Sequence, residues 1–168
     1  FCLDGLQLQM VSSNTTYGGD GAEYRTVPDT FVKVTSHQPD ALGPTYFKAY
    51  FPNGRIATFG ADAARVSRIE GPRFEGKPAA SNSGSTTFQT IGDVRLAWSV
   101  SQTEDRAGNA LAYFYSSNGQ LGVEQLLSEI RYTFNSKTGS VADSERKVVF
   151  TYEARPDTST KYLSGFRF

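Results

Sequence analysis

Apolar and polar residues alternate along much of the chain, with the period of two that is typical of a β-strand. Leu6, Leu8 and Met10, for example, alternate with glutamines. Strands are predicted over residues 6–11, 31–34, 46–51, 56–59, 86–91, 94–103, 110–115, 127–134 and 147–154. Helical periodicity is limited to residues 61–69 and 122–127, which are too short to form stable helices without tertiary packing. The pattern therefore predicts an all-β fold of antiparallel hairpins, in one or two sheets, with at most short helices.

The clearest hairpin covers residues 98–115, WSVSQTEDRAGNALAYFY, which begin at Trp98. One strand ends near Glu104, and the next carries Leu111, Tyr113 and Tyr115 on one face. The turn between them contains Asp105, Arg106, Ala107, Gly108 and Asn109. We expect the aspartate to accept backbone N–H bonds, the arginine to pair outward, and the glycine or the asparagine to be left-handed.

A second hairpin is predicted at Asn53-Gly54, between the strands at 46–51 and 56–59. Asn-Gly tolerates the positive φ angles of a type I′ turn, whose twist matches that of the flanking strands. The region richest in Ser, Gly and Ala is 75–85, and it is a candidate soft boundary within a single β-rich segment that spans residues 1–168. Because the chain begins with Phe and ends abruptly, we expect it to be a segment of a larger protein that carries any targeting signal.

Composition excludes several classes of function. The 17 basic and 17 acidic residues give a net charge of zero, whereas a protein that binds nucleic acid would usually have a basic excess. The apolar runs are far shorter than the roughly 20 residues that span a bilayer, and no polybasic block is present to bind a membrane surface. The single cysteine, Cys2, cannot form an internal disulfide. Aromatic residues make up 13% of the chain, and their large contact area suits a pleated sheet.

Candidate catalytic groups are few. Glu104 and Asp105 could form a carboxylate pair for acid–base hydrolysis, but adjacent strand residues point to opposite faces. The single histidine, His37, lies in a polar stretch that is predicted to be a surface loop, and Cys2 between Phe1 and Leu3 is predicted to be a small buried side chain. We therefore expect no catalytic residues.

Candidate metal ligands are equally sparse. Asp4, Asp20 and Asp29 lie next to Gly or Pro in predicted turns, and the spacing of a calcium-binding loop is absent. Phosphate-binding glycine motifs are also absent. We therefore expect neither a metal nor a cofactor.

Aromatic residues leave one alternative open. Trp98, Tyr113, Tyr115, Tyr132 and Tyr152 could form a platform that binds sugars, or they could pack in the core as cross-strand pairs. Packing in the core needs no ligand and is preferred. A carbohydrate- or protein-binding β-sandwich remains the alternative function.

An ordered series of segments resembles a known family. The segments are FCLDGLQL, YGGDGAEYRTVPDTF, GPTYFKAYFPNGRIATFG, WSVSQTEDRAGNALAYFY, IRYTFN, VVFTYEARPD and YLSGFRF, which follow one another over nearly the whole chain. Their order and spacing resemble the SpvB-type N-terminal region of the B component of bacterial insecticidal toxin complexes (Tc toxins), which is related to Rhs/YD-repeat proteins. Tyr-Asp repeats of the usual form are not visible here, so the resemblance is to the region that precedes the repeat array.

The resemblance implies a non-catalytic structural role. The chain would contribute to a β-rich shell, in a secreted bacterial toxin complex, that encloses a C-terminal effector. Its partners would be other segments of the same large protein and a second toxin-complex component, with no nucleic acid and no membrane contact from this segment. Because strands at a broken edge of such a wall would be left unpaired, we expect the isolated chain to dimerise or to swap strands.

Overall fold

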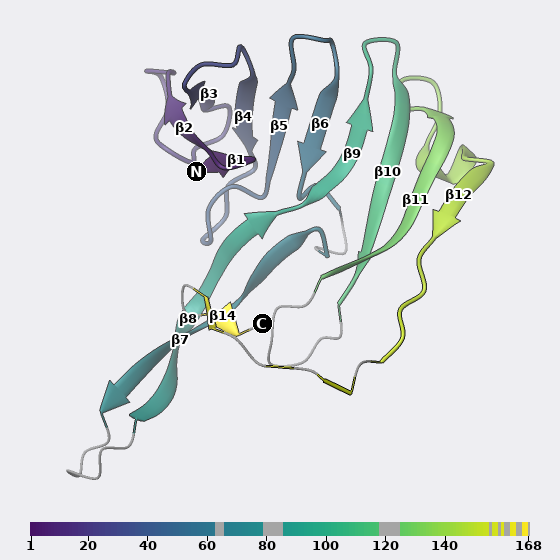
Figure 1. Cartoon of the computed structure of the whole chain (residues 1–168). Helices are drawn as coiled ribbons and strands as arrows, with labels where there is room; N and C mark the ends of the chain where they lie inside the picture. Colours follow the sequence, from purple (N-terminus) through teal and green to yellow (C-terminus); the bar gives the residue numbers. More distant parts are fainter. Residues whose placement is uncertain are drawn as a thin grey trace.

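The computed structural model describes residues 1–62, 66–78, 86–117, 125–154, 156–157, 159, 162–163 and 166–167. These residues fold almost entirely into antiparallel strands, which confirms the predicted all-β class (Figure 1). The strands are β1 (Cys2–Leu3), β2 (Leu6–Met10), β3 (Glu23–Val27), β4 (Lys33–His37), β5 (Tyr46–Tyr50), β6 (Ile56–Phe59), β7 (Arg68–Pro78), β8 (Thr86–Trp98), β9 (Val100–Glu104), β10 (Asn109–Ser116), β11 (Leu126–Asn135), β12 (Arg146–Val149), β13 (Tyr162–Leu163) and β14 (Phe166–Arg167). A 3₁₀ turn, η1 (Val141–Asp143), lies in the loop between β11 and β12.

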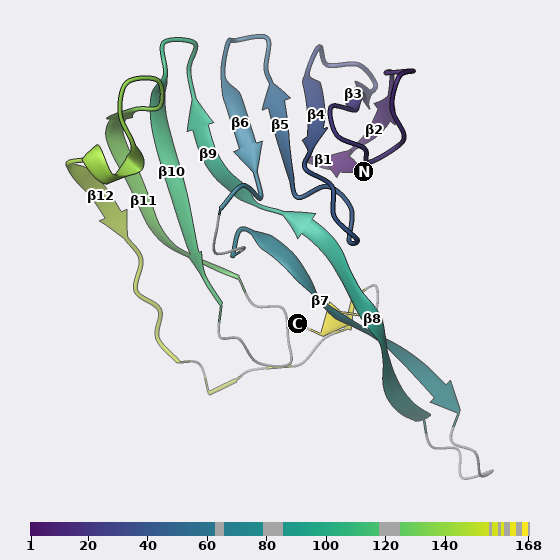
Figure 2. The same ribbon diagram turned by 180° about the vertical axis from the view of Figure 1, so that it is seen from behind.

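Ten strands form one sheet in the order β1-β2-β3-β4-β5-β6-β9-β10-β11-β12. Apart from the excursion through β7 and β8, each strand pairs with the next strand along the chain, as a series of hairpins requires. Among the described strands, β7 and β8 pair only with each other. Their hairpin extends away from the large sheet (Figures 1 and 2). β13 and β14 form a separate small pair.

The first half of the large sheet buries one of its faces. Cross-strand partners lie on the same face, so Tyr24, Val34 and Ala49, which pair in succession, share a face and are fully buried there. The cluster on this face comprises Leu8, Ala22, Tyr24, Val32, Val34, Phe47 and Ala49, with Phe1, Leu3, Met10, Phe51, Phe59 and Trp98 packed against it. The alternation that predicted the strands therefore also identifies much of this core.

The second half of the sheet buries the opposite face. The first face is followed across the sheet through the pairs Ala49–Ala57, Ala57–Thr103 and Thr103–Leu111. Leu111 is 40% exposed, whereas its neighbours Ala110 and Ala112 are buried and point the other way. Phe134 pairs with Ala110, and with Val141 of η1 these residues form a second apolar cluster. The sheet therefore has two cores, on opposite faces of its two ends.

β8 and β9 form one long path that changes partner at Ser99. The Ser99 N–H donates to the Ser67 carbonyl over 2.7 Å, and the Ser99 carbonyl accepts the Gly60 N–H over 3.0 Å. Strands were predicted at 86–91 and 94–103, but the observed strands β8 and β9 meet at Ser99. Gly92, near which a break was predicted, instead lies at a register shift between β7 and β8 with a φ of +113°, so the strand continues through a bulge.

Three other sequence predictions need correction. β3 was not predicted, because the charged residues of EYRTV face outward and leave only Tyr24 and Thr26 buried. A helix over residues 61–69 is wrong: Asp62 accepts the N–H groups of Val66 and Ser67 in a turn, and β7 begins at Arg68. β12 ends at Val149, short of the predicted 154. Residues 122–124 of the other predicted helix lie outside the described residues, and Leu126 begins β11.

Candidate functional site

The turn between β5 and β6 ends in a left-handed glycine. The Gly54 N–H donates to the Phe51 carbonyl over 2.9 Å, and the Phe51 N–H donates to the Arg55 carbonyl over 2.9 Å. Gly54 has a φ of +87°, while Asn53 does not have a positive φ. The predicted type I′ turn is therefore wrong, because that type needs positive φ at both central residues. Gly54 alone adopts the left-handed conformation, as a glycine does at a bulge beside a hairpin turn.

The turn between β9 and β10 repeats this pattern. The Gly108 N–H donates to the Asp105 carbonyl over 3.0 Å, and Gly108 has a φ of +92°. The Asp105 carboxylate accepts the Asn109 backbone N–H over 2.9 Å and the Asn109 Nδ2 over 2.8 Å. These bonds, with that from the asparagine side chain as the largest influence, lower the pKa of Asp105. The carboxylate thus holds the turn in its ionised form.

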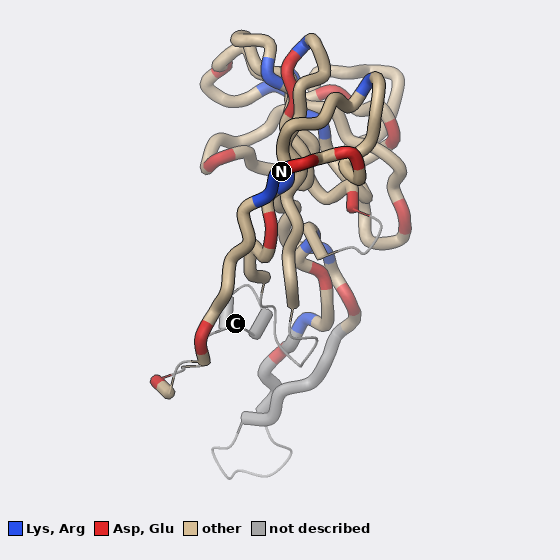
Figure 3. The backbone as a smooth tube through the Cα atoms, turned by 90° about the vertical axis from the view of Figure 1, so that its right-hand side faces the viewer, with Lys and Arg blue, Asp and Glu red and all other residues tan. Residues whose placement is uncertain are grey.

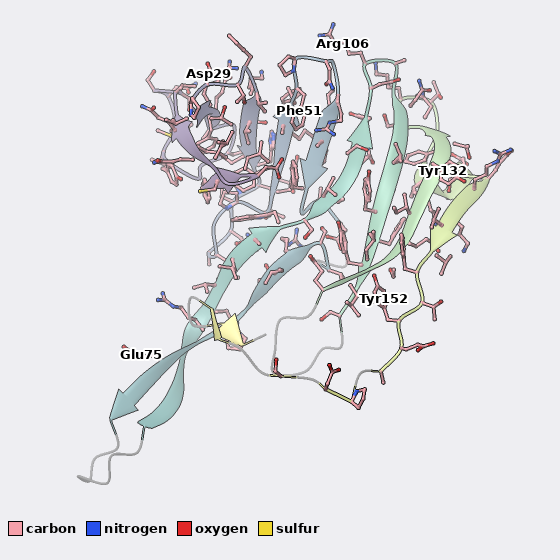
Figure 4. All side chains as sticks on the ribbon, viewed as in Figure 1. Asp29, Phe51, Glu75, Arg106, Tyr132 and Tyr152 are labelled. Carbon is pink, nitrogen blue, oxygen red and sulfur yellow. The ribbon has the colours of Figure 1, made fainter. Side chains whose placement is uncertain are left out.

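The two turns lie side by side at one end of the sheet. A third turn, at 135–139, bonds to the second of them. A Cβ added to Gly54 would lie 3.0 Å from the Arg106 Nε, so the first turn leaves room for that arginine. On the other side, Asn135 donates from Nδ2 to the Ala107 carbonyl over 3.0 Å, and Lys137 donates to the Arg106 carbonyl. Phe51 and Arg106 mark this end in Figure 4. We call the turns at 51–55, 105–109 and 135–139 the linked turns.

An open hollow of about 830 Å³ lies beside the linked turns. Its lining comprises Asn53, Arg55, Thr103, Glu104, Asp105, Asn109, Ala110, Leu111, Tyr132, Thr133, Phe134 and Asn135. Several of its polar groups bind other protein groups: the Asn53 Oδ1 accepts the Arg55 N–H over 3.0 Å, and the Arg55 guanidinium lies 4.1 Å from the centre of the Phe51 ring. Such internal bonding favours a structural role for this end of the sheet.

Glu104 and Asp105 have separate hydrogen-bond partners in this arrangement. The Glu104 carboxylate accepts a bond from Gln102 Nε2 over 3.1 Å and another from the Ser136 hydroxyl. The Asp105 carboxylate is bound instead to Asn109, within its own turn.

The five candidate aromatic residues do not form a single platform. Trp98 packs edge-on against Phe47, with ring centres 4.9 Å apart, and donates from Nε1 to the Pro44 carbonyl over 3.0 Å. Tyr132 lies at the hollow on β11, and Tyr152, which is 50% exposed, lies at a different level of the sheet (Figure 4).

Tyr113 and Tyr115 bond to the neighbouring strand β9. The Tyr115 hydroxyl donates to the Val100 carbonyl over 2.8 Å, and the Tyr113 hydroxyl lies 3.4 Å from the Thr103 hydroxyl. Burial raises the pKa of Tyr115 to about 12, with smaller contributions from Tyr113 and Asp62. The two tyrosines therefore fasten β10 to β9.

His37 and Cys2 differ from their predicted environments. His37 is the last residue of β4, where its ring stacks on Tyr46 at 4.7 Å and its Nε2 lies 2.8 Å from the Thr35 hydroxyl. Burial lowers the pKa of His37; Lys48 lowers it further, while Asp20 opposes the shift. Cys2 is exposed because it lies on the short edge strand β1.

The aspartates that were predicted to lie in turns all lie in connections between strands. The Asp20 carboxylate accepts the Gln38 N–H over 2.8 Å, and the Asp29 carboxylate accepts the Phe31 N–H over 2.7 Å. Asp4 lies between β1 and β2 with a φ of +48°. Within the described residues, no three His, Cys, Asp or Glu side chains are grouped as a metal site, and no helix is long and apolar enough to cross a membrane.

Sequence reasoning missed a buried arginine that holds the β7–β8 hairpin to the large sheet. The Arg95 side chain is fully buried and donates to the Glu70 carboxylate over 2.8 Å and to the Asp40 carboxylate over 2.9 Å. It also donates to the carbonyls of Gly43 and Pro44, over 2.9 and 2.8 Å. Burial alone would lower its pKa, but the bonds to both carboxylates raise it. Its place between Val94 and Leu96, within an apolar strand, is the signal that could have revealed it.

Arg68 strengthens the same junction. Its side chain is 3% exposed and donates to the carbonyls of Thr45 and Gly60, the first over 3.3 Å. Its Nε lies 3.8 Å from the Glu70 carboxylate, which also binds Arg95. Buried guanidinium groups with several acceptors fix geometry strongly, because loss of one partner leaves the others unsatisfied. The junction thus sets the direction in which the hairpin leaves the sheet.

These features define an all-β protein built on one large antiparallel sheet. Comparison with solved structures finds similarity to a chain of the crystal structure of TcdB2-TccC3, with a TM-score of 0.48 and 18% sequence identity. The match covers 100% of this chain and 9% of that chain, so this chain spans a small part of its length. No family model and no curated protein matches the sequence.

Proposed function

We propose that this chain is a non-catalytic structural segment of a toxin-complex protein, where it contributes to a β-rich shell that encloses a C-terminal effector. The observation that carries the proposal is the single ten-stranded sheet whose two cores lie on opposite faces. A sandwich needs a second sheet on one common face, so this arrangement suits a wall better. The ordered resemblance of the sequence to the B component of Tc toxins supports the same role.

The distribution of polar groups also supports a structural role. In the linked turns, two side chains of the turn at 135–139 bind the backbone of the turn at 105–109, as Asn135 does at Ala107. Basic and acidic residues are interspersed along the tube in Figure 3, and the net charge of the chain is zero. This surface suits packing against other segments of the same protein and against a second toxin-complex component, in a secreted assembly.

The proposal is tested by the structure of the complete protein that contains this segment, together with protease protection of its effector. We expect the sheet to line a closed cavity and the effector to be protected from added protease. Arg95→Met should increase digestion of the effector by weakening the wall, while Arg25→Met, at a half-exposed pair with Glu23, should not. A sheet that lies outside any cavity, or an effector digested equally in all three proteins, would contradict the proposal.

The alternative is a carbohydrate- or protein-binding module, which the open hollow beside Tyr132 favours. An aromatic ring offers a large apolar contact area, and side-chain amides offer hydrogen-bond donors and acceptors, which together suit a saccharide. A glycan array probed with the purified chain distinguishes the two proposals. Binding that is lost in Tyr132→Ala and kept in Tyr152→Ala would support the module, because only the first tyrosine lines the hollow.

A further inference from the structure

The two edges of the large sheet differ in length and in covering. β1 has two residues, whereas β12 has four and continues in the exposed residues 150–154. Val148, Val149, Phe150 and Tyr152 along this edge are 37–59% exposed, which is high for apolar side chains on a strand. A long, apolar edge with free backbone groups is the usual template for addition of another strand. β12 is therefore the edge at which association is expected.

The backbone groups available on this edge follow from the pairing with β11. The Phe150 N–H donates to the Ser128 carbonyl over 2.9 Å, so this residue points its backbone groups inward. Backbone groups alternate in direction along an antiparallel strand, so those of Lys147 and Val149 point away from β11, and extension of the strand by two residues would turn those of Thr151 the same way. The Tyr152 hydroxyl donates to the Leu127 carbonyl over 2.8 Å, which keeps the segment beyond β12 alongside β11.

The charges along this edge are complementary to those of the same edge reversed. The segment reads Arg146-Lys147, then Val148 to Tyr152, and then Glu153, so its basic end faces its acidic end in an antiparallel pair. From this pattern we propose that β12 pairs antiparallel with β12 of a second copy of this chain. The inference goes beyond the proposed function, since a monomeric segment could still serve in a wall.

Charges distinguish two registers that both pair the outward backbone groups. A register that centres Val149 on itself places Glu145 opposite Glu153, which is repulsive. A shift by one residue in each chain keeps outward groups paired and centres Phe150 on Phe150 of the second copy. Val148 then lies opposite Tyr152, and Lys147 lies opposite Glu153. Lys147, whose Nζ lies 3.2 Å from the Glu129 carboxylate, would have a carboxylate on either side.

Charge reversal tests this pairing without relying on a single variant. We expect the unmodified chain to form a dimer in sedimentation equilibrium, and Lys147→Glu or Glu153→Lys alone to weaken it about tenfold, because like charges then face each other. An equimolar mixture of the two variants should recover the affinity as a heterodimer. Gln9→Glu and Gln9→Lys, on exposed positions of β2, are the matched controls and should leave the dimer unchanged.

Cysteine cross-linking tests the register. In a Cys2→Ser background, Phe150→Cys should cross-link to itself under mild oxidation, since directly opposed residues that do not share hydrogen bonds approach closely. Val148→Cys alone should not cross-link, but its mixture with Tyr152→Cys should. A chain that stays monomeric at all concentrations, single charge variants that dimerise as well as the unmodified chain, or a mixture that fails to recover would each overturn the proposal.

Discussion

Arg95 of β8 donates to the carboxylate of Asp40, which lies 55 residues earlier in the loop between β4 and β5, over 2.9 Å. This bond crosses from the β7–β8 hairpin to the large sheet. Because the guanidinium is fully buried and also binds Glu70, the junction depends on one side chain with several acceptors. The pairing of β7 with β8 joins these two strands to each other, whereas Arg95 joins the hairpin to the large sheet.

Replacing Arg95 should destabilise the fold strongly. Arg95→Met removes the guanidinium that donates to two carboxylates and two carbonyls, and removal of one partner from a buried ion pair costs about 3–5 kcal/mol. Arg95→Lys should cost less than Met but remain destabilising, because an ammonium cannot donate in a planar fork. Urea unfolding gives both values. Arg25→Met removes a half-exposed pair and should change the free energy of unfolding by less than about 1 kcal/mol. Equal losses at Arg95 and Arg25 would contradict the role of the junction.

Gly108 should tolerate substitution less well than Gly5, although both have positive φ. A Cβ at Gly108 would lie 2.7 Å from the Asn135 Oδ1, whereas a Cβ at Gly5 would meet nothing within 4 Å. Gly5→Ala should therefore cost only the backbone strain, about 1–2 kcal/mol, and Gly108→Ala should cost more. Thermal unfolding of the two variants measures the difference. An equal cost would mean that Asn135 moves aside freely.

Alkaline pH should destabilise the fold through Tyr115. Its folded pKa is about 12 and its unfolded value is 10.0, so the unfolded state releases its proton first as the pH rises. The stabilisation is complete below pH 10.0 and is lost progressively up to about pH 12. The urea concentration at the unfolding midpoint should fall less over this pH interval in Tyr115→Phe than in the unmodified chain. Tyr152→Phe, at an exposed tyrosine, is the control. The same slope in both variants would rule out Tyr115 as the source.

Trp98 fluorescence should not respond to saccharides. It is the single tryptophan of the chain, and its ring packs against Phe47 while its Nε1–H is bound to the Pro44 carbonyl. Since the ring is part of the first core, sugar binding at the hollow would not reach it. Titration with a panel of mono- and oligosaccharides is the measurement. A saturable change in emission would contradict this expectation and would mean that a saccharide reaches the first core at Trp98.

Much of the sheet could be predicted from local alternation, and its exceptions have physical causes. β2, β5, β6, β10 and β11 were predicted close to their observed bounds, because each alternates and is flanked by turn residues. β3 was not predicted because two of its five residues, Glu23 and Arg25, are charged. The departure of the β7–β8 hairpin from the sheet could not be predicted, since Arg95 fixes it through partners more than 50 residues away.

The candidate residues illustrate the same limit. The turn that contains Asp105 and Gly108 could be described from sequence because its bonds are local. The contact of Arg106 with Gly54 could not, because it joins two turns that only the sheet order places together. The burial of opposite faces at the two ends also lies beyond local reasoning, since alternation shows which residues share a face but not which face is covered.

β9 lies between the two cores, and all five of its residues are only half-buried. Its hydrogen bonds to β6 and β10 hold it in the sheet, but neither core packs fully against it. Hydrogen bonds between strands tolerate a change of twist, whereas interlocked side chains resist it. The sheet can therefore change its curvature along β9 at less cost than across β3 to β5. A barrier assembled from such sheets could adjust its radius at this line without opening a gap.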